Sequence, residues 1–276
     1  MDRLETLAPG VGRLPLRTPT LPPATSTNLL IVGHSRLVLI EPATPFEDER
    51  RVLDQVLEAL AAEGRRVELL VVTHHHVDHI GDVERLQQRL GVPVGAHPET
   101  AARLSMPVDR RLEDGDELDL GEGIRMRAVH TPGHAPGHLV LHELSSGIAH
   151  AGDMVAGEGT ILIDPEDAGD MGQYLDSLRR MGELGTRALV PAHGPTLKEP
   201  RAVVDHYVRH RLRREAKVLA AIDAGAEDEG EILARAYDDT PRVLWPLAAR
   251  ALEAHLRKLE VDGVIERHQG RSRRGG

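Results

Sequence analysis

The residues best suited to chemistry lie in the segment Thr73-His74-His75-His76-Val77-Asp78-His79. Neutral imidazole and carboxylate groups are good ligands for zinc and similar ions. His74 and His76 are two residues apart, so in an extended backbone their side chains point to the same side. Burying so many polar groups without partners would cost too much free energy for a purely structural role. The segment therefore predicts a metal site, with a solvated histidine-rich loop as the alternative.

The elements around this segment indicate how it would be held in place. The preceding run, residues 67–72, is apolar and β-branched, which predicts a buried strand. The histidines therefore follow the carboxyl end of a strand, where α/β proteins usually place their chemistry. Three further candidate ligands, His134, Asp153 and His193, each lie beside a glycine at the end of another expected strand. This repetition favours one shared site.

Strand and helix patterns alternate through residues 1–200, which predicts an α/β domain. Strands are expected at 29–33, 37–41, 67–72, 92–97, 124–130, 138–144, 147–151 and 188–191, and helices at 47–63, 83–90 and 171–184. Residues 1–24 are rich in proline and leucine and are expected to form an irregular lead-in.

The order of the candidate ligands resembles that of a known family. His-x-His-x-Asp-His, followed by Gly-His, Gly-Asp and a final Ala-His-Gly, is similar to the metallo-β-lactamase superfamily, over roughly residues 25–200. The resemblance implies a four-layer αββα sandwich with a dinuclear metal site. It implies that one ion is held by His74, His76 and His134, the other by Asp78, His79 and His193, and that Asp153 bridges them.

The resemblance also implies the chemistry of the site. Two Zn²⁺ ions, with Mn²⁺ or iron as other possibilities, would share a hydroxide that acts as the nucleophile. Asp78 is expected to be catalytic, because its loss should remove one metal and most of the activity. Glu41 stands where the family usually has aspartate beneath the metals. His130 and His138 are expected either to orient ligands or to be structural, and His97 is a candidate substrate contact.

Residues 201–276 predict a second, mostly helical domain. Helices are expected at 201–222, 231–237 and 246–260, and a short strand at 264–267, which together suggest a small winged-helix-type fold. The basic tail, 267–274, is expected to be disordered. Residues 201–217 carry a net charge of +4, whereas residues 223–239 carry −6, counted from their Lys, Arg, Asp and Glu.

Two functions remain open from the sequence. Residues 207–211, 255–260 and 263–265 resemble the β-lactamase-like group whose mitochondrial member is a single-strand-specific endoribonuclease. That resemblance implies an RNA phosphodiesterase in which Arg209 and Arg211 bind phosphates. Fungal thioesterases that release polyketides from acyl carrier protein share the architecture, so an acyl thioesterase or a lactone or ester hydrolase is the alternative. A binding protein with a vestigial site is the non-enzyme hypothesis.

Composition limits these possibilities further. The chain has 276 residues, no cysteine, 2% aromatic residues and a net charge of −10. The negative charge argues against a general nucleic-acid coat, and scarce aromatics argue against base stacking. No apolar run is long enough to span a membrane, so a cytoplasmic protein is expected. The C-terminal domain is expected to cap the active-site cleft and build a possible homodimer rather than bind nucleic acid.

Overall fold

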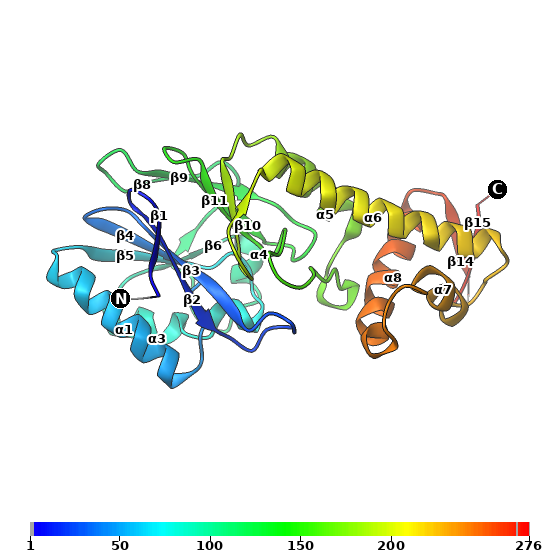
Figure 1. The fold of residues 1–276 in the computed structure, drawn as a ribbon, viewed down its shortest axis with the longest axis horizontal. Helices are drawn as coiled ribbons and strands as arrows, with labels where there is room; N and C mark the ends of the chain where they lie inside the picture. The colour runs from blue at the N-terminus through cyan, green and yellow to red at the C-terminus, as the bar shows by residue number, and fades with distance from the viewer. Residues whose placement is uncertain (1–2, 269, 276) are drawn as a thin grey trace.

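The computed structural model describes residues 3–268 and 270–275. Figure 1 shows a sandwich of two sheets with helices on both outer faces, from which α6 (Pro200–Asp223) runs out to a smaller helical domain. The arrangement confirms the expected α/β class, the αββα sandwich and the C-terminal winged-helix-like domain. None of the helices in the described part of the chain is long and apolar enough to cross a membrane.

The two sheets of the sandwich follow the chain in order. The first has the strand order β1-β2-β3-β4-β5-β6-β7, antiparallel up to β4 and parallel from β4 onward. Its strands are β1 (Glu5–Ala8), β2 (Val11–Arg17), β3 (Ser26–Val32), β4 (Arg36–Ile40), β5 (Arg66–Val71), β6 (Val94–Ala96) and β7 (Arg110–Arg111). The second has the order β13-β12-β11-β10-β9-β8. Its strands are β8 (Glu117–Asp119), β9 (Arg125–His130), β10 (Leu139–Glu143), β11 (Ile148–Gly152), β12 (Ala188–Pro191) and β13 (Leu197–Lys198).

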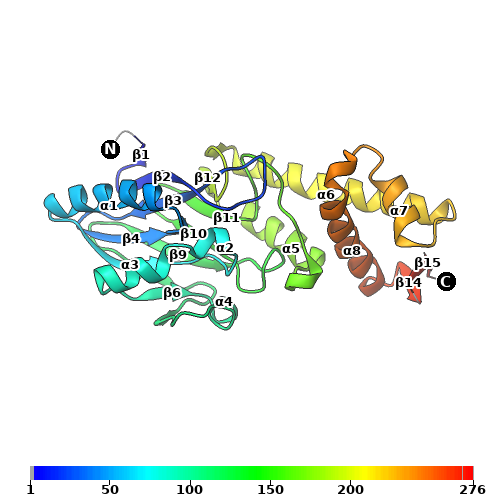
Figure 2. The ribbon, with the colours of Figure 1, turned by 90° about the horizontal axis from the view of Figure 1, so that it is seen from below.

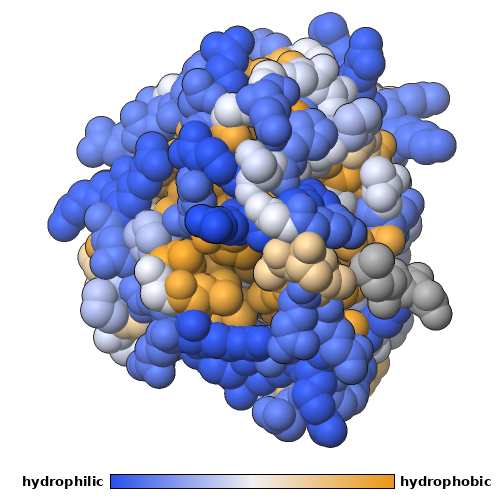
Figure 3. Space-filling model, turned by 90° about the vertical axis from the view of Figure 1, so that its left-hand side faces the viewer, coloured by the Kyte–Doolittle hydropathy of each residue, from blue (hydrophilic) through white to orange (hydrophobic). Residues whose placement is uncertain are grey.

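Three apolar layers hold the sandwich together. Side chains such as Ile40, Val71 and Met126 fill the space between the sheets. Helices α1 (Glu47–Ala62) and α3 (Val83–Leu90) pack on the outer face of the first sheet, and α5 (Met171–Gly182) packs with α6 on the outer face of the second. Short helices α2 (Val77–Ile80) and α4 (Pro98–Ala101) and the 3₁₀ turn η1 (Pro165–Asp167) lie in the connections. Figure 3 looks onto one end of the sandwich, where apolar side chains lie in a hollow between hydrophilic ones.

The expectation of an irregular lead-in over residues 1–24 was wrong for residues 5–8 and 11–17, which form β1 and β2, and correct for residues 18–24. Residues 1–2 lie outside the described part of the chain, and β2 pairs with β3 along its whole length. Pro15 hides the strand in the sequence, because proline cannot donate a ladder hydrogen bond. β1 pairs with β2 only as far as Arg13. Pro15 therefore has no β1 residue opposite it that would need a hydrogen bond from its backbone nitrogen.

The C-terminal domain contains α7 (Glu229–Ala236), the turn η2 (Arg242–Leu244), α8 (Trp245–Val261) and a hairpin of β14 (Ile265–His268) and β15 (Arg271–Arg274). The expectation of a disordered tail at 267–274 was wrong for residues 267, 268 and 271–274, which pair as part of β14 and β15, whereas residue 269 lies outside the described part of the chain. The arginines of β15 also reach acidic groups, as in the Arg274–Asp223 and Arg271–Glu227 ion pairs. Two views agree that α8 lies beside α5 and α6 (Figures 1 and 2).

Helix α6 belongs to both parts of the molecule. Val204 packs into the core beneath the second sheet, whereas Val218 packs into the core of the C-terminal domain. The separated charges of 201–217 and 223–239 also meet here, because Lys217 pairs with Asp238 and Asp239, and Arg214 pairs with Asp239. The basic side of the helix is therefore partly neutralised within the protein.

Candidate metal centre

The candidate ligands follow the ends of four strands. β5 leads into residues 74–79, β9 into His134, β11 into Asp153 and β12 into His193. The side chains from these separate segments meet in two groups, one containing His74, His76, His134 and Asp153 and the other containing Asp78, His79 and His193. All seven residues that the sequence pattern selected therefore lie together.

In the first group, three ring nitrogens converge on one point. The distances are 2.9 Å from His74 Nε2 to His76 Nδ1, 3.2 Å from His74 Nε2 to His134 Nε2 and 3.0 Å from His134 Nε2 to His76 Nδ1. Two nitrogens bound tetrahedrally to one zinc ion would be about 3.3 Å apart. Burial, with the neighbouring His134, lowers the pKa of His76 to about 3. Burial also lowers the pKa of His74 and of His134, so the three rings of this group are neutral, as metal ligands must be.

In the second group, Asp78 lies between two imidazoles. Its Oδ1 is 3.7 Å from His79 Nε2, and its Oδ2 is 3.5 Å from His193 Nε2. Burial by itself would raise the pKa of Asp78, but His79 and His193 lower it well below its usual range. The carboxylate is therefore ionised and available as a ligand.

Asp153 lies between the two groups. Its Oδ2 is 3.4 Å from His134 Nε2 and 3.7 Å from His79 Nε2, and its Oδ1 is 3.5 Å from His193 Nε2. Within the described residues, Asp153 Oδ1 and His79 Nε2 are buried without a hydrogen-bond partner. Buried polar atoms normally have one. A divalent metal ion would satisfy both, so this donor set fits such an ion.

Every imidazole in the two groups is also held from behind. The ring nitrogen that faces away from the centre has a hydrogen-bond partner, which fixes the orientation of the ring. These contacts are His74 Nδ1 with Thr73 Oγ1 (2.9 Å), His76 Nε2 with Asp167 (2.8 Å), His79 Nδ1 with Glu41, His134 Nδ1 with the Leu162 carbonyl (2.8 Å) and His193 Nδ1 with the Ser26 carbonyl (2.9 Å). Sequence reasoning missed Asp167, because nothing in its local sequence distinguishes it from other loop acids.

Glu41 supports the site despite its departure from the usual aspartate. The side chain is fully buried, and its Oε1 accepts a hydrogen bond of 2.7 Å from the Thr73 amide while Oε2 contacts His79. The backbone at Glu41 has a φ of 64°, a left-handed conformation that is uncommon for residues other than glycine. In this conformation the carboxylate lies beneath both the Thr73 amide, at the start of the histidine segment, and the His79 ring.

The other three candidate histidines differ in their relation to the centre. His138 Nε2 accepts a hydrogen bond of 3.0 Å from the Asp153 amide, so it supports the backbone of a candidate ligand. His130 instead directs Nε2 to the Pro136 carbonyl at 2.8 Å. Its ring stacks on His97, with centroids 3.9 Å apart. His97 is not among the described residues that line the cavity beside the candidate ligands.

Glycines allow the close approach of the ligand loops. A Cβ on Gly133 would lie 2.1 Å from the Tyr174 backbone nitrogen, and one on Gly152 would lie 2.3 Å from His138 Nε2. Both glycines also have positive φ, 126° and 50°. The Gly-His and Gly-Asp pairs in the sequence therefore reflect packing behind His134 and Asp153.

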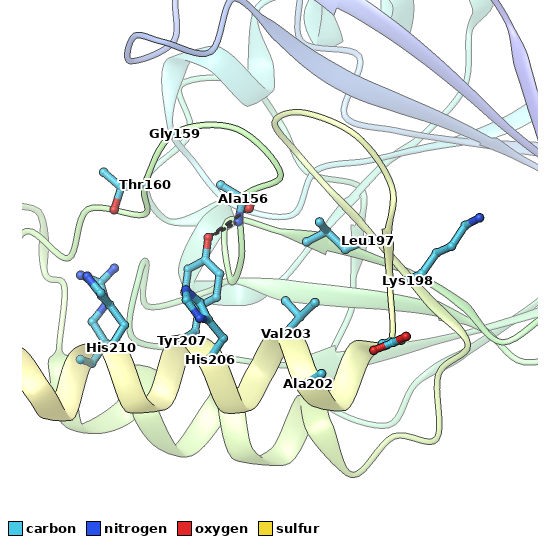
Figure 4. A pocket seen from close by; sticks show the side chains of 12 residues that line it. Ala156, Gly159, Thr160, Leu197, Lys198, Ala202, Val203, His206, Tyr207 and His210 are labelled. Carbon is cyan, nitrogen blue, oxygen red and sulfur yellow. Dashed lines mark hydrogen bonds between the residues drawn. The ribbon is translucent and has the colours of Figure 1, made fainter.

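Three adjoining cavities begin at the centre, and only the first of them is lined by candidate ligands. A cleft of about 470 Å³ contains Asp78, His134, Asp153 and His193, and residues Leu247 and Arg250 of α8 form part of its wall. It shares residues 21, 159, 160, 162 and 247 with an apolar pocket of about 360 Å³ between the sandwich and the C-terminal domain. A third cavity, of about 540 Å³, lies along α6, where Tyr207, His206 and His210 rise toward the loop at 156–160 (Figure 4).

The two candidate phosphate-binding arginines lie in different environments. Arg211 is only 5% exposed, donates to the Ile161 carbonyl and lines both the apolar pocket and the cavity on α6. Arg209 is exposed on α6 and lines none of these three cavities. The structure therefore does not bring the two guanidinium groups together at the metal centre.

The sandwich and its histidine–aspartate centre define the class of metal-dependent hydrolases built on two β-sheets. Residues 21–193 match the Metallo-beta-lactamase superfamily, and residues 229–273 match the Beta-lactamase associated winged helix domain. The chain belongs to the metallo-beta-lactamase superfamily, whose members are generally hydrolases.

Two relatives of similar sequence support this assignment, and one solved structure has a similar fold. The chain is 28% identical to a Drosophila melanogaster protein named Beta-lactamase-like protein 2 homolog, over 87% of this chain and 84% of that one. It is 29% identical to an atrochrysone carboxyl ACP thioesterase of Aspergillus fumigatus, over 80% and 68%. A metallo-beta-lactamase family protein of Thermus thermophilus has the same fold, with a TM-score of 0.79, 24% identity and coverage of 98% and 100%.

Proposed function

We propose that this protein is a divalent-metal hydrolase of acyl thioesters or related esters. The observation that carries the proposal is the continuity of the metal cleft with the apolar pocket, through shared residues that include Leu21, Leu162 and Leu247. Apolar walls favour an acyl chain, because its burial removes hydrocarbon surface from water. A thioesterase name among the relatives supports the same substrate class.

The chain supplies the centre with two sets of ligands and a shared carboxylate. His74, His76 and His134 would hold one ion, Asp78, His79 and His193 the other, and Asp153 would join them. When bound, the ions supply a water of lowered pKa and a Lewis acid for the carbonyl oxygen. Zn²⁺ suits this nitrogen- and oxygen-rich set, and Mn²⁺ or iron would also fit.

Charge in the cleft favours an ester over a polyanion. Acidic groups Glu158, Asp164 and Asp167 line the cleft around the ligands. Arg250 is the sole lysine or arginine among the described residues of the lining, and it pairs with Asp164 at 2.7 Å. The described lining also contains no phenylalanine, tyrosine or tryptophan on which a base could stack.

A single-strand RNA phosphodiesterase is the second candidate. The match of residues 229–273 to a winged-helix domain favours it, because winged-helix relatives of the helix-turn-helix fold commonly bind nucleic acid. Against it, arginines of this domain are paired with acids, as in Arg267 with Glu253 and Arg273 with Glu266. The C-terminal domain is therefore better suited to covering the cleft through α8.

A paired assay separates these candidates. Metal-loaded protein would be given hexanoyl-N-acetylcysteamine and labelled single-stranded RNA, with Asp78→Ala as the control that removes a metal ligand. We expect thioester hydrolysis that is lost in Asp78→Ala and no cleavage of RNA. RNA cleavage that depends on Asp78, without thioester turnover, would replace the acyl hydrolase with the nuclease.

A further inference from the structure

Arg211 presents a buried positive charge without an acidic partner. The residue is 5% exposed, and its one hydrogen bond among the described residues goes to the Ile161 carbonyl. Its Nε is buried without a partner. Two other basic residues of α6 behave differently, since Arg214 and Lys217 both pair with Asp239. Its guanidinium lies 5.4 Å from the centroid of the Tyr174 ring, which offers no full negative charge. Burying a charge without an acidic partner is costly, and a bound anion would offset that cost.

The position of Arg211 shows where such a partner could bind. Its side chain lies where the apolar pocket meets the cavity on α6, and the two spaces share residues 159, 160, 210 and 211. The apolar pocket has Leu244, Leu247 and Ala248 of the C-terminal domain on one side. It opens into the metal cleft past Leu162 and Leu247. A chain that enters from the metal centre would therefore pass apolar walls before it reaches the guanidinium group.

A second unpartnered group lines the same pocket. Tyr237 is 5% exposed, and within the described residues its hydroxyl is buried without a hydrogen-bond partner. Burial raises the pKa of Tyr237 to about 12, so the hydroxyl stays protonated and can donate. The Arg214 guanidinium lies 4.2 Å above the same ring, although its charge is paired with Asp239.

We propose that this pocket binds a carboxylate at the far end of the substrate's acyl chain. Arg211 is its counter-charge, and the Tyr237 hydroxyl is a hydrogen-bond donor to it. The proposal rests on the proposed acyl hydrolase, whose substrate class it narrows to acyl chains that carry a terminal acid. A carboxylate suits the site better than a carrier phosphate, because most of the pocket wall is apolar.

Matched substrates test this proposal on the metal-loaded protein. N-acetylcysteamine thioesters of glutaric, adipic and suberic acids would be compared with thioesters of equal length that end in a carboxamide or a methyl group. We expect the best of the acid-ended chains to have a kcat/KM about ten- to a hundredfold above its carboxamide analogue, the usual range for a charge-assisted hydrogen bond. Equal values for the three end groups at every length would overturn the proposal.

Three variants locate the effect. Arg211→Gln should abolish the preference for the acid, so that kcat/KM of the acid-ended chain falls to that of its carboxamide analogue. Tyr237→Phe should reduce the preference severalfold, although its hydroxyl contacts no protein group among the described residues. Arg213→Gln, an exposed position on the same helix, should preserve the preference. If Arg211→Gln lowers all substrates equally, the residue only supports the loop at 161 and the proposal fails.

A binding measurement without turnover tests the carboxylate site independently of the proposed hydrolase activity. In titration calorimetry, hexanoate should bind the metal-loaded protein more tightly than hexanamide, and Arg211→Gln should remove the difference. That result without thioester turnover would support the carboxylate site and reject only the hydrolase. Equal hexanoate affinity in wild type and Arg211→Gln would overturn the site. A different result with coenzyme A thioesters would also overturn the site. If their turnover fell in Arg211→Gln while turnover of the acid-ended N-acetylcysteamine thioesters did not, Arg211 would bind the phosphates of the carrier and not the end of the acyl chain.

Discussion

The carboxylate of Glu41 joins the loop that carries the histidines to one of those histidines. One oxygen accepts a 2.7 Å hydrogen bond from the Thr73 amide, and the other contacts Nδ1 of His79. Burial alone would lower the pKa of His79, but the carboxylates of Glu41, Asp153 and Asp78 raise it well above its usual range. The three carboxylates therefore make the surroundings of His79 negative, and a bound divalent cation would neutralise them in place of a proton on the ring.

Glu41→Gln should weaken metal binding. The neutral amide would keep the size of the side chain but lose the negative charge behind His79, and losing such an outer partner typically costs about 10- to 100-fold in metal affinity or activity. Zinc affinity measured by competition with a chelator checks this. Glu143→Gln changes another buried carboxylate, which instead binds Ser145 and Ser146, and should leave the affinity unchanged. Equal affinity in Glu41→Gln and wild type would refute the role of Glu41.

Substituting a ligand in one of the two groups should remove the ion of that group and leave the other ion bound. Asp78→Ala should lose one equivalent of metal and most of the activity, because His74, His76 and His134 still converge on the other position. His76→Ala should instead lose the ion beside His74 and His134 and keep the ion beside Asp78, His79 and His193. Metal content after gel filtration, read by elemental analysis, gives the stoichiometry. Two retained equivalents in either variant would be incompatible with the assigned ligands.

The wall formed by α8 should affect acyl chains according to their length. Leu247→Asn should raise KM for a hexanoyl thioester about tenfold, because it removes part of the apolar surface that the chain covers. KM for the acetyl thioester should change little. Val243→Asn is the control, since Val243 is 83% exposed and lines neither the cleft nor the apolar pocket. An equal change in KM for both substrates would show that α8 does not contact the acyl chain.

Gly133 should tolerate substitution much less well than Gly64. Both have positive φ, but a Cβ on Gly133 would collide with the Tyr174 backbone, whereas one on Gly64 meets nothing within 4 Å. Gly133→Ala should lower the free energy of unfolding by about 3 kcal/mol or more, and Gly64→Ala by about 1 kcal/mol. Urea denaturation measures both. Similar losses would mean that the loop before His134 can shift freely.

His97 should make stability depend on acid pH. Burial and the neighbouring His130 lower the pKa of His97 from 6.5 to about 4. The unfolded chain therefore takes up the proton first, and stability is lost as the pH falls from about 6.5 toward 4. In His97→Gln this contribution is absent, so the difference in unfolding free energy from wild type should shrink over that range. A constant difference would contradict the shift.

The ligand pattern was visible in the sequence because four of the residues cluster directly after one expected strand, and because His134, Asp153 and His193 each lie beside a glycine at the end of another. Features that depend on distant contacts were not. Asp167 reaches His76 from 91 residues away, and a carbonyl such as that of Leu162 has no side-chain signature. β2 was hidden by Pro15, and β15 by its charged residues, which are stabilised by ion pairs with the helical domain.

The most direct test of the two-ion centre is a zinc-loaded crystal measured at the zinc absorption edge. We expect two anomalous peaks about 3.5–4 Å apart, with Asp153 between them. One peak should lie beside His74, His76 and His134, and the other beside Asp78, His79 and His193. A single peak, or a second one remote from Asp78 and His193, would contradict the two-ion centre.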